Sequence, residues 1–210
     1  MSDEPRRTGE ALLELVEVMD RLRRECAWTA EQTHETLARY VLEETHEVLE
    51  ALDAGDPAQL RDELGDLLMQ VVFHARIGAE RAGADRFDVD DVARGITEKL
   101  RRRNPHVFGD GTARTPAEID AAWQAVKAQE KRERGGRVSV HDGIPSSLPA
   151  LAYADKVLKR LGEPAVADAV DDAGDIGARL LALVAEARAA GVDAEESLRR
   201  TVRSLPDAPA

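Results

Sequence analysis

Apolar side chains recur every three or four positions along almost the whole chain, and this spacing limits the fold more than any other feature. Between residues 9 and 25, one stripe consists of Leu12, Leu15, Val16, Met19 and Leu22. The spacing matches the 3.6 residues per turn of an α-helix, and the only extended candidate is residues 138–140. Three Phe, two Trp and two Tyr leave the core to Leu, Val, Ile and Ala. The sequence therefore predicts an all-α, antiparallel helical bundle.

Turn residues divide this helical pattern into segments. Gly55 suits the left-handed conformation that ends a helix, Asp56 suits the cap of the next helix, and Pro57 suits its first position. We interpret residues 26–32 as a polar break and residues 104–114 as a loop. The predicted helices cover residues 9–25, 33–54, 57–82, 89–103, a stretch that opens with a capping box at 115–118, and then 148–161, 165–190 and 194–205.

Composition and charge exclude several classes of protein. A net charge of −12 leaves no broad basic surface for nucleic acid, and only residues 99–103 supply a local one. No run approaches the ~18 apolar residues of a membrane span. The single cysteine, Cys26, forms no disulfide framework, and residues 1–7 do not open a signal peptide. We therefore expect a cytoplasmic protein with no nucleic-acid or membrane partner.

Four carboxylates are expected at one level on two neighbouring helices. Glu44 and Glu47 lie three residues apart, as do Glu63 and Asp66, and residues at that spacing share a helix face. The short turn at residues 55–57 makes the two helices antiparallel, so the pairs can face each other. A like-charge pair at ~4 Å costs about 1 kcal/mol in water and ~4 kcal/mol at an intermediate dielectric. Because oxygen ligands suit Mg²⁺ or Mn²⁺, the pattern favours a metal site over a solvated face.

These acids belong to a longer motif. Glu43-Glu44-x-x-Glu47 followed by Glu63-x-x-Asp66 resembles the EExxE…ExxD signature of the all-α nucleoside triphosphate pyrophosphohydrolases, and specifically of the MazG family. The similarity covers residues 10–134 and resumes after a linker. It includes the segments Gln32-Thr33-His34, Lys99-Leu100-Arg101-Arg102-Arg103, Asn104-Pro105-His106-Val107-Phe108 and Ile144-Pro145-x-x-Leu148-Pro149.

The resemblance implies roles for nine residues. The implied Mg²⁺ ligands, with Mn²⁺ as a substitute, are Glu44, Glu47, Glu63 and Asp66. The implied catalytic cations, which match positions that hold triphosphate oxygens, are Lys99 and Arg103. The implied substrate-binding residues are Trp123, Glu43 and Trp28. Around Trp28 the chain reads Cys26-Ala27-Trp28-Thr29, where the family often has Cys-Pro-Trp-Asp, so one family carboxylate is missing near the expected base.

The resemblance also implies a reaction and an assembly. The expected reaction is hydrolysis of nucleoside or deoxynucleoside triphosphates to a monophosphate and pyrophosphate. The expected assembly is a homodimer with a four-helix core built from both chains. The sequence does not indicate which base and sugar the substrate carries. It also leaves two physiological roles open, nucleotide-pool housekeeping and alarmone control.

The chain is expected to have two parts joined by a linker. Residues 1–134 form the catalytic helical domain, and residues 135–147, rich in Gly, Pro and Ser, form the linker. In residues 148–210 the string Asp62-Glu63-Leu64-Gly65-Asp66 returns as Asp171-Asp172-Ala173-Gly174-Asp175, without a second EExxE. Since full-length members of the family carry two copies, we interpret this part as a degenerate, non-catalytic repeat. From the residues alone, two unrelated amphipathic helices explain the match equally well.

Two other functions remain in competition. Glu31-x-x-His34 and Glu43-x-x-His46 match the spacing of a carboxylate-bridged di-iron bundle, which requires these motifs on different, facing helices. A non-catalytic helical dimerisation module is the second alternative, and it predicts no metal-dependent turnover. The five histidines show no mutual ligand spacing, and we expect them at the surface or in helix packing.

Overall fold

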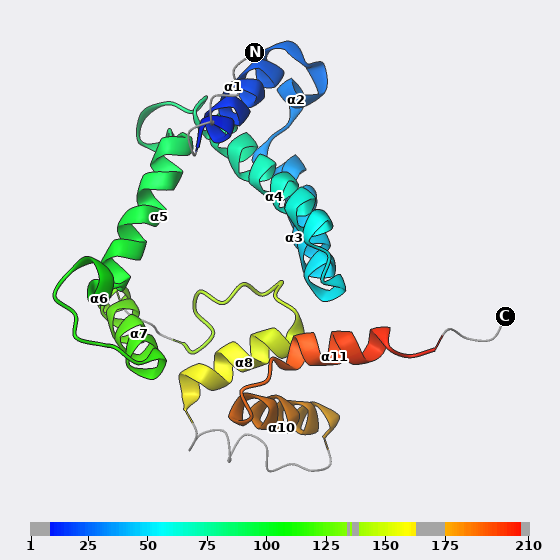
Figure 1. Cartoon of the computed structure of the whole chain (residues 1–210), viewed down its shortest axis with the longest axis vertical. Coiled ribbons are helices and arrows are strands. Elements are labelled where there is room, and N and C mark those ends of the chain that lie inside the picture. Colours follow the sequence, from blue (N-terminus) through cyan, green and yellow to red (C-terminus); the bar gives the residue numbers. More distant parts are fainter. Residues whose placement is uncertain (1–8, 134, 136–138, 163–174, 207–210) are drawn as a thin grey trace, which may run out of the picture. The chain divides into compact units, whose positions relative to one another are not determined.

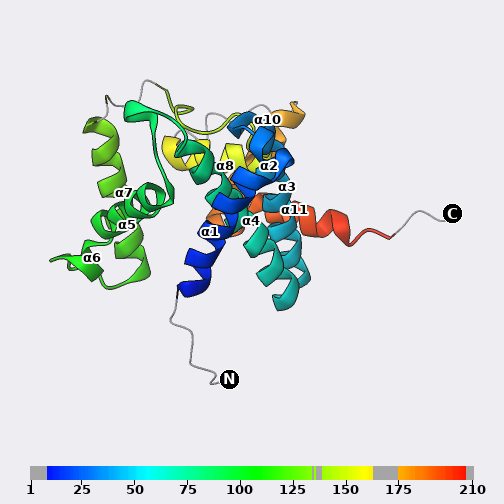
Figure 2. The same ribbon diagram turned by 90° about the horizontal axis from the view of Figure 1, so that it is seen from above.

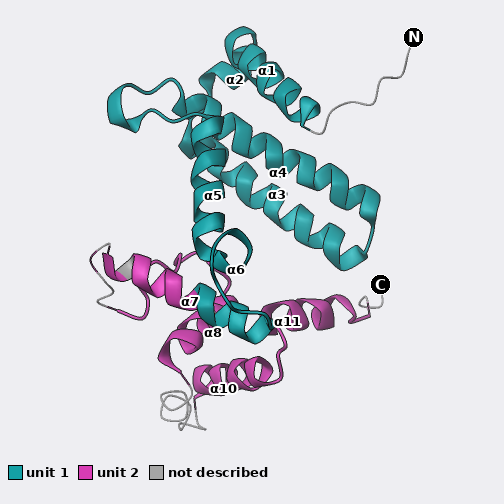
Figure 3. Ribbon diagram, turned by 60° about the vertical axis from the view of Figure 1, so that its left-hand side comes forward, with its two compact units in different colours: residues 1–123 teal, residues 124–210 magenta. Residues whose placement is uncertain are grey.

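The computed structural model describes residues 9–133, 135, 139–162 and 175–206, and its described residues form helices, turns and loops without a strand. The predicted all-α class is therefore confirmed. Two compact units divide the chain, residues 1–123 and residues 124–210 (Figure 3). The division falls inside α7 (Pro116–Glu133), ahead of the linker expected at 135–147. The two-domain boundaries and the dimeric core stay predictions.

The first unit is built around a helical hairpin. The helices α3 (His34–Ala54) and α4 (Pro57–Gly78) run side by side and antiparallel (Figure 1). The helix α1 (Glu10–Glu25) packs on α4, and the short α2 (Ala27–Glu31) joins α1 to α3. After the 3₁₀ turn η1 (Gly83–Asp85), the helix α5 (Val89–Arg103) leaves the hairpin and leads to α6 (Pro105–Phe108) (Figures 1 and 2).

Local capping explains where the hairpin helices begin and end. Thr33 accepts a hydrogen bond from the backbone N–H of Thr36, and the Thr36 hydroxyl accepts one from the N–H of Thr33, at 3.3 and 2.9 Å. Gly55 has φ 68°, the left-handed conformation that a side chain would strain. Asp56 then accepts from the N–H of Ala58 at 2.8 Å, with Pro57 at the first helical position. These contacts confirm the predicted turn at residues 55–57.

Three predicted boundaries in the first unit were wrong. The helix expected over 57–82 ends at Gly78, where a Cβ atom would lie 2.6 Å from the Phe87 ring. After the helix the chain folds back, and the N–H of Phe87 donates to the Gly78 carbonyl at 3.3 Å. The segment 26–32 contains α2, and the loop expected at 104–114 contains α6. These segments form single short helices that hydrophobic periodicity does not reveal.

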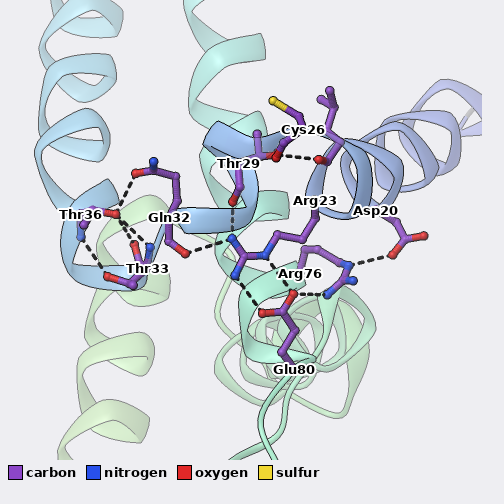
Figure 4. Close-up of polar contacts among 10 residues, drawn as sticks. Asp20, Arg23, Cys26, Thr29, Gln32, Thr33, Thr36, Arg76 and Glu80 are labelled. Atoms are coloured by element: carbon purple, nitrogen blue, oxygen red, sulfur yellow. Dashed lines mark hydrogen bonds and ion pairs between the residues drawn. The ribbon is translucent and has the colours of Figure 1, made fainter.

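Apolar contacts and one polar cluster hold α1 against α4. The buried core of the first unit consists of Met19, Leu37, Val72, Phe73 and Ile77. Beside it, the Arg23 guanidinium makes two hydrogen bonds of 2.9 Å to the Glu80 carboxylate (Figure 4). Arg23 also donates to the backbone carbonyls of Thr29 and Gln32. One guanidinium therefore connects α1, the C-terminal end of α2 and the turn that follows α4.

Among its described residues, the second unit has three helices after the end of α7. They are α8 (Ala150–Leu161), α10 (Ile176–Ala189) and α11 (Ala194–Arg203), and α10 packs on both of the others. Leu158 and Val184 are its largest fully buried side chains, and Arg188 pairs with Asp155 at 3.0 Å. Asp175 caps α10 by accepting from the N–H of Ala178 at 2.9 Å. The first part of the helix expected over 165–190 lies outside the described residues.

None of the helices in the described part of the chain combines the length and apolar character needed to cross a membrane.

Candidate metal centre

The α3–α4 hairpin brings three of the four predicted metal ligands together. Glu44 of α3 and Glu63 and Asp66 of α4 each offer a carboxylate oxygen, and the three oxygens lie within 4.8 Å of one another. Glu44 and Glu63 are half-buried, whereas Asp66 is exposed. The two side chains from α4 are three residues apart and therefore share one face of that helix. The hairpin turn sets them opposite Glu44.

Burial and mutual repulsion both act on these acids. The pKa of Glu44 is raised from its ordinary value of 4.5, first by burial and then by the charges of Asp66 and Glu47. The pKa of Glu63 is also raised, first by burial and then by the charges of Glu47 and Asp66. Glu47 is thus electrostatically coupled to the cluster, although it is not one of the three closest groups. The cluster binds protons or cations more readily than isolated carboxylates do.

The donor atoms fit a hard divalent cation. All three converging ligand atoms are carboxylate oxygens, with neither histidine nor cysteine among them. Mg²⁺ prefers a few such oxygens and keeps the rest of its sphere for waters and substrate phosphates. The partial exposure of the cluster leaves room for a charged substrate on that side.

Gln70 is a member of this site that sequence reasoning missed. It lies on α4 one turn beyond Asp66, is only 4% exposed, and hydrogen-bonds the Glu44 side chain. Since a carboxylate only accepts, the Gln70 amide N–H₂ is the donor. Its other amide atom, Oε1, is buried and has no hydrogen-bond partner among the described residues. A polar residue inside the apolar stripe of α4 was the available signal.

The two basic side chains predicted to bind phosphate do not lie near the carboxylates of the same chain. Lys99 and Arg103 lie in the last turns of α5, and that end of α5 diverges from the hairpin (Figures 1 and 3). The Arg103 guanidinium carbon lies 5.3 Å from the centroid of the Trp123 ring, within reach of a cation–π contact. The structure therefore joins a predicted phosphate-binding residue to a predicted nucleotide-binding residue, apart from the metal ligands.

The other two predicted substrate residues have different surroundings. Trp28 packs on Tyr40 in a T-shaped contact at 6.1 Å and on Phe73 at 6.5 Å, so its ring anchors α2 at the edge of the core. It keeps 52% of its surface exposed. Glu43 is exposed on α3 and is not one of the three converging acids.

Comparison with known proteins identifies the family to which this site belongs. Residues 32–108, which contain both carboxylate pairs, match the family model of the MazG nucleotide pyrophosphohydrolase domain. A relative from Streptomyces cacaoi, described as an uncharacterized 26.1 kDa protein, is 46% identical over 95% of this chain and 81% of its own length. The chain belongs to the MazG family.

Relatives with a named activity extend this assignment. Relatives named nucleoside triphosphate pyrophosphohydrolase occur in Mycolicibacterium smegmatis and Escherichia coli. They are 40% and 46% identical over 95% and 70% of this chain, respectively. The chain spans only 58% and 55% of those two relatives, so it is similar to part of each.

A histidine pair within the segment that matches the MazG domain was not predicted. His34 at the start of α3 and His74 on α4 are stacked with ring centroids 5.0 Å apart, and their Nδ1 atoms are 2.7 Å apart. The pKa of His74 is lowered, first by burial and then by the charge of His34. The expectation of helix-packing histidines was correct for these two residues, but their 40-residue separation left no local signal of the contact.

Proposed function

We propose that this chain hydrolyses nucleoside or deoxynucleoside triphosphates to a nucleoside monophosphate and pyrophosphate in the presence of Mg²⁺. The observation that carries the proposal is the convergence of Glu44, Glu63 and Asp66 on a hairpin inside the segment that matches the MazG domain. The names of the relatives in Mycolicibacterium smegmatis and Escherichia coli support the reaction type. The raised pKa of two of the acids supports a requirement for cations at neutral pH.

The proposed metal ligands are the three converging acids together with Glu47. When bound there, Mg²⁺ (or Mn²⁺ in its place) supplies charge neutralisation of the triphosphate and acidification of a coordinated water. Gln70 holds the Glu44 carboxylate toward the other acids. Lys99 and Arg103 are proposed to bind phosphate oxygens, and Trp123, with Glu43 and Trp28, the nucleoside. We keep the cytoplasm as the proposed compartment.

We propose that the active protein is a homodimer. Exposed apolar side chains form a stripe on α4, with Leu64, Leu68 and Val71, and another on α5, with Val92, Ile96 and Leu100. Two such stripes on neighbouring helices are suited to packing against another helical pair. Since the cationic end of α5 diverges from the carboxylates of its own chain, the α5 of a second copy is the proposed source of the missing phosphate ligands.

The two competing functions have less support. A di-iron site requires each ExxH motif on one helix, but Glu31 ends α2 and His34 begins α3, with a break between them. The His46 Nδ1 atom lies 2.7 Å from the Leu42 carbonyl oxygen of its own helix. A non-catalytic module would not need three repelling acids, two of them half-buried, on facing helices.

A phosphate-release assay tests the proposed reaction. The full chain is incubated with each of the common nucleoside and deoxynucleoside triphosphates, with inorganic pyrophosphatase added, and phosphate is measured with malachite green. We expect release only when Mg²⁺ or Mn²⁺ and the pyrophosphatase are both present. The monophosphate product, followed by chromatography, distinguishes this cleavage from sequential loss of single phosphates. No turnover with any nucleotide would favour the non-catalytic module, and anaerobic Fe²⁺ binding with a di-iron absorption band would favour the other alternative.

A further inference from the structure

A basic pocket lies in the second unit, between the C-terminal part of α7 and α8. It has a volume of about 690 Å³, within the range of about 300–1,000 Å³ that is usual for small-molecule sites. Its lining residues all lie between positions 124 and 160, so the pocket belongs to the second unit alone (Figure 3). Among the described residues, its cationic lining consists of Lys127, Arg132, Lys156, Lys159 and Arg160, with Asp155 as the one acid.

Helical spacing places these cations on two surfaces that face each other across the pocket. On α7, Ala128 and Arg132 are four residues apart and share one face of the helix. On α8, Lys156 and Lys159 are three residues apart and likewise share a face. The sequence indicated a local basic surface only at residues 99–103. The second one was missed because the linker separates its two halves, and only the fold brings them together.

Three of these cations have no counter-charge. The side chains of Arg132, Lys156 and Lys159 are exposed, and none of them forms a hydrogen bond or ion pair within the part of the chain that the structure describes. Asp155 is already paired with Arg188 at 3.0 Å. Acids are not scarce, since the chain has 41 Asp and Glu against 29 Lys and Arg. The cations around the pocket therefore repel one another, and a bound anion would relieve that repulsion.

One wall of the pocket is held in place before any ligand binds. The Arg160 guanidinium donates to the backbone carbonyls of Val140 and Asp142, the second at 3.0 Å. These bonds attach the loop after the linker to α8, and the same loop supplies Gly143 and Pro145 to the lining. Because this wall is already ordered, a ligand loses less free energy to ordering the protein when it binds.

We propose that this pocket binds the pyrophosphate group of a small anion, free pyrophosphate or a nucleoside di- or triphosphate, through Arg132, Lys156 and Lys159. Two adjacent phosphates carry several negative charges in a compact group, so they can reach cations on both helices at once. Arginine offers a fork of donors to phosphate oxygens, and lysine offers a concentrated charge. The proposal gives residues 148–210 a binding role and does not depend on the proposed reaction.

Calorimetry of the full chain in EDTA tests the proposal, with inorganic pyrophosphate as the probe. We expect saturable binding that weakens as salt is added. Arg132→Ala, and Lys156→Ala combined with Lys159→Ala, should each weaken binding at least about tenfold, because each removes charge-assisted hydrogen bonds. Arg179→Ala is the matched control and should stay within about twofold. Arg179 is also exposed and lies in the same unit, but on α10 and outside the pocket lining.

The basic residues of α5 are the competing site for this anion. Lys99→Ala should leave the binding that depends on Lys156 and Lys159 within about twofold. If Lys99→Ala instead abolishes pyrophosphate binding, and the Lys156 and Lys159 double variant retains it, the anion binds at the site of the proposed reaction and the pocket proposal is wrong. Because no turnover is measured, this result is independent of whether the chain cleaves any nucleotide.

Nucleotides in the same assay define the ligand. ATP should bind and should lose affinity in the same variants, whereas AMP, with a single phosphate, should bind at least about tenfold more weakly than pyrophosphate. An affinity for ATP at least about tenfold above that for pyrophosphate would identify a nucleotide as the ligand, and similar affinities would identify pyrophosphate itself. Absence of pyrophosphate binding, or AMP binding as tight as that of pyrophosphate, would overturn the proposal. Tighter binding of a single-stranded oligonucleotide through the same residues would overturn it in favour of nucleic acid.

Discussion

Burial, the repulsion of neighbouring carboxylates and hydrogen bonding all act on Glu44 in the proposed metal site. Its carboxylate is half-buried, faces Asp66 and Glu63 across the hairpin, and receives a hydrogen bond from Gln70. Burial and like charge raise its pKa, whereas the Gln70 contact lowers it, and the net shift is upward. A group in this position destabilises the metal-free protein when ionised and serves the function when a cation is bound.

Replacing Glu44 tests the metal site most directly. Glu44→Gln keeps the shape of the side chain but removes one charge and one ligand oxygen. Since disturbing even the residues around a metal ligand costs about 10–100-fold, we expect at least a ~100-fold loss of Mg²⁺-dependent cleavage, with an unchanged helical circular dichroism spectrum. Glu50 is an exposed acid near the C-terminal end of α3, and Glu50→Gln is the control. It should leave the cleavage rate within about twofold of the wild type. Near-normal turnover of Glu44→Gln would remove this residue from the site.

The same residue predicts a pH dependence of stability without metal. A carboxyl whose folded pKa lies above its unfolded value binds its proton more tightly in the folded state. Stability therefore falls as the pH rises from about the unfolded value of 4.5 through the raised folded value, and stays at the lower level above it. In EDTA, Glu44→Gln should have a higher Tm than the wild type at pH 8, and the difference should shrink toward pH 4. A Tm difference that does not vary with pH would contradict the raised pKa.

At the scale of elements, the Arg23 guanidinium determines how α1 and α2 attach to α4. Its side chain is 10% exposed, and it pairs with Glu80, which is also bound by Arg76 at 2.9 Å. Arg76 in turn reaches Asp20 of α1 at 2.8 Å (Figure 4). The apolar core alone would allow α1 to slide along α4, and these directional contacts select one position.

Removing this guanidinium should be costly. Arg23→Ala leaves two carbonyl oxygens of the α2 segment without their donor and takes one partner from Glu80. We expect the free energy of unfolding to fall by about 2 kcal/mol. This value already allows for solvent screening of the ion pair, because the Glu80 side chain is 41% exposed. Urea denaturation measures it, with Arg21→Ala as control. The Arg21 side chain is 74% exposed and pairs with Glu25. Removing this ion pair should lower the free energy of unfolding by at most about 0.5 kcal/mol. Equal effects of the two variants would show that burial of Arg23 contributes nothing.

At the scale of the whole molecule, the exposed apolar stripes of α4 and α5 predict self-association. Ile96→Glu places a charge in the centre of the α5 stripe. In a monomer this residue faces water and the change should be harmless, whereas in the proposed dimer it buries an unpaired charge. We expect light scattering to give a dimer for the wild type and a monomer for Ile96→Glu. Val107→Glu, at a more exposed apolar position on α6, should remain dimeric. A wild-type monomer at micromolar concentration would refute the dimer.

The C-terminal unit gives a second prediction at this scale. Asp175, which corresponds to Asp66 in the proposed degenerate repeat, is the N-cap of α10. Asn also caps helices well, so Asp175→Asn removes the charge and keeps the cap. We expect its cleavage rate to match that of the wild type, whereas Asp66→Asn should lose most activity. Comparable losses in the two variants would assign Asp175 to the active site and overturn the non-catalytic interpretation of residues 148–210.

Much of the hairpin and its acids followed from the sequence alone, because the responsible interactions are local. The 3.6-residue period predicted the helices, and the turn at Gly55, Asp56 and Pro57 predicted that α3 and α4 would be antiparallel. Three-residue spacing on each helix then predicted that Glu63 and Asp66 would meet Glu44, and they do. Each of these steps depends on residues within a few positions of one another, or on the length of one short connection.

The tertiary structure alone decided which distant groups meet. Arg23 reaches Glu80 across 57 residues and His34 reaches His74 across 40, and no period or cap in the sequence encodes either contact. Gln70 faces Glu44 only because α3 and α4 pack at one particular register. Phe87, just before α5, packs so closely on Gly78 that a Cβ atom at residue 78 would lie 2.6 Å from its ring. Side-chain packing in three dimensions sets these relations, and local spacing carries no information about them.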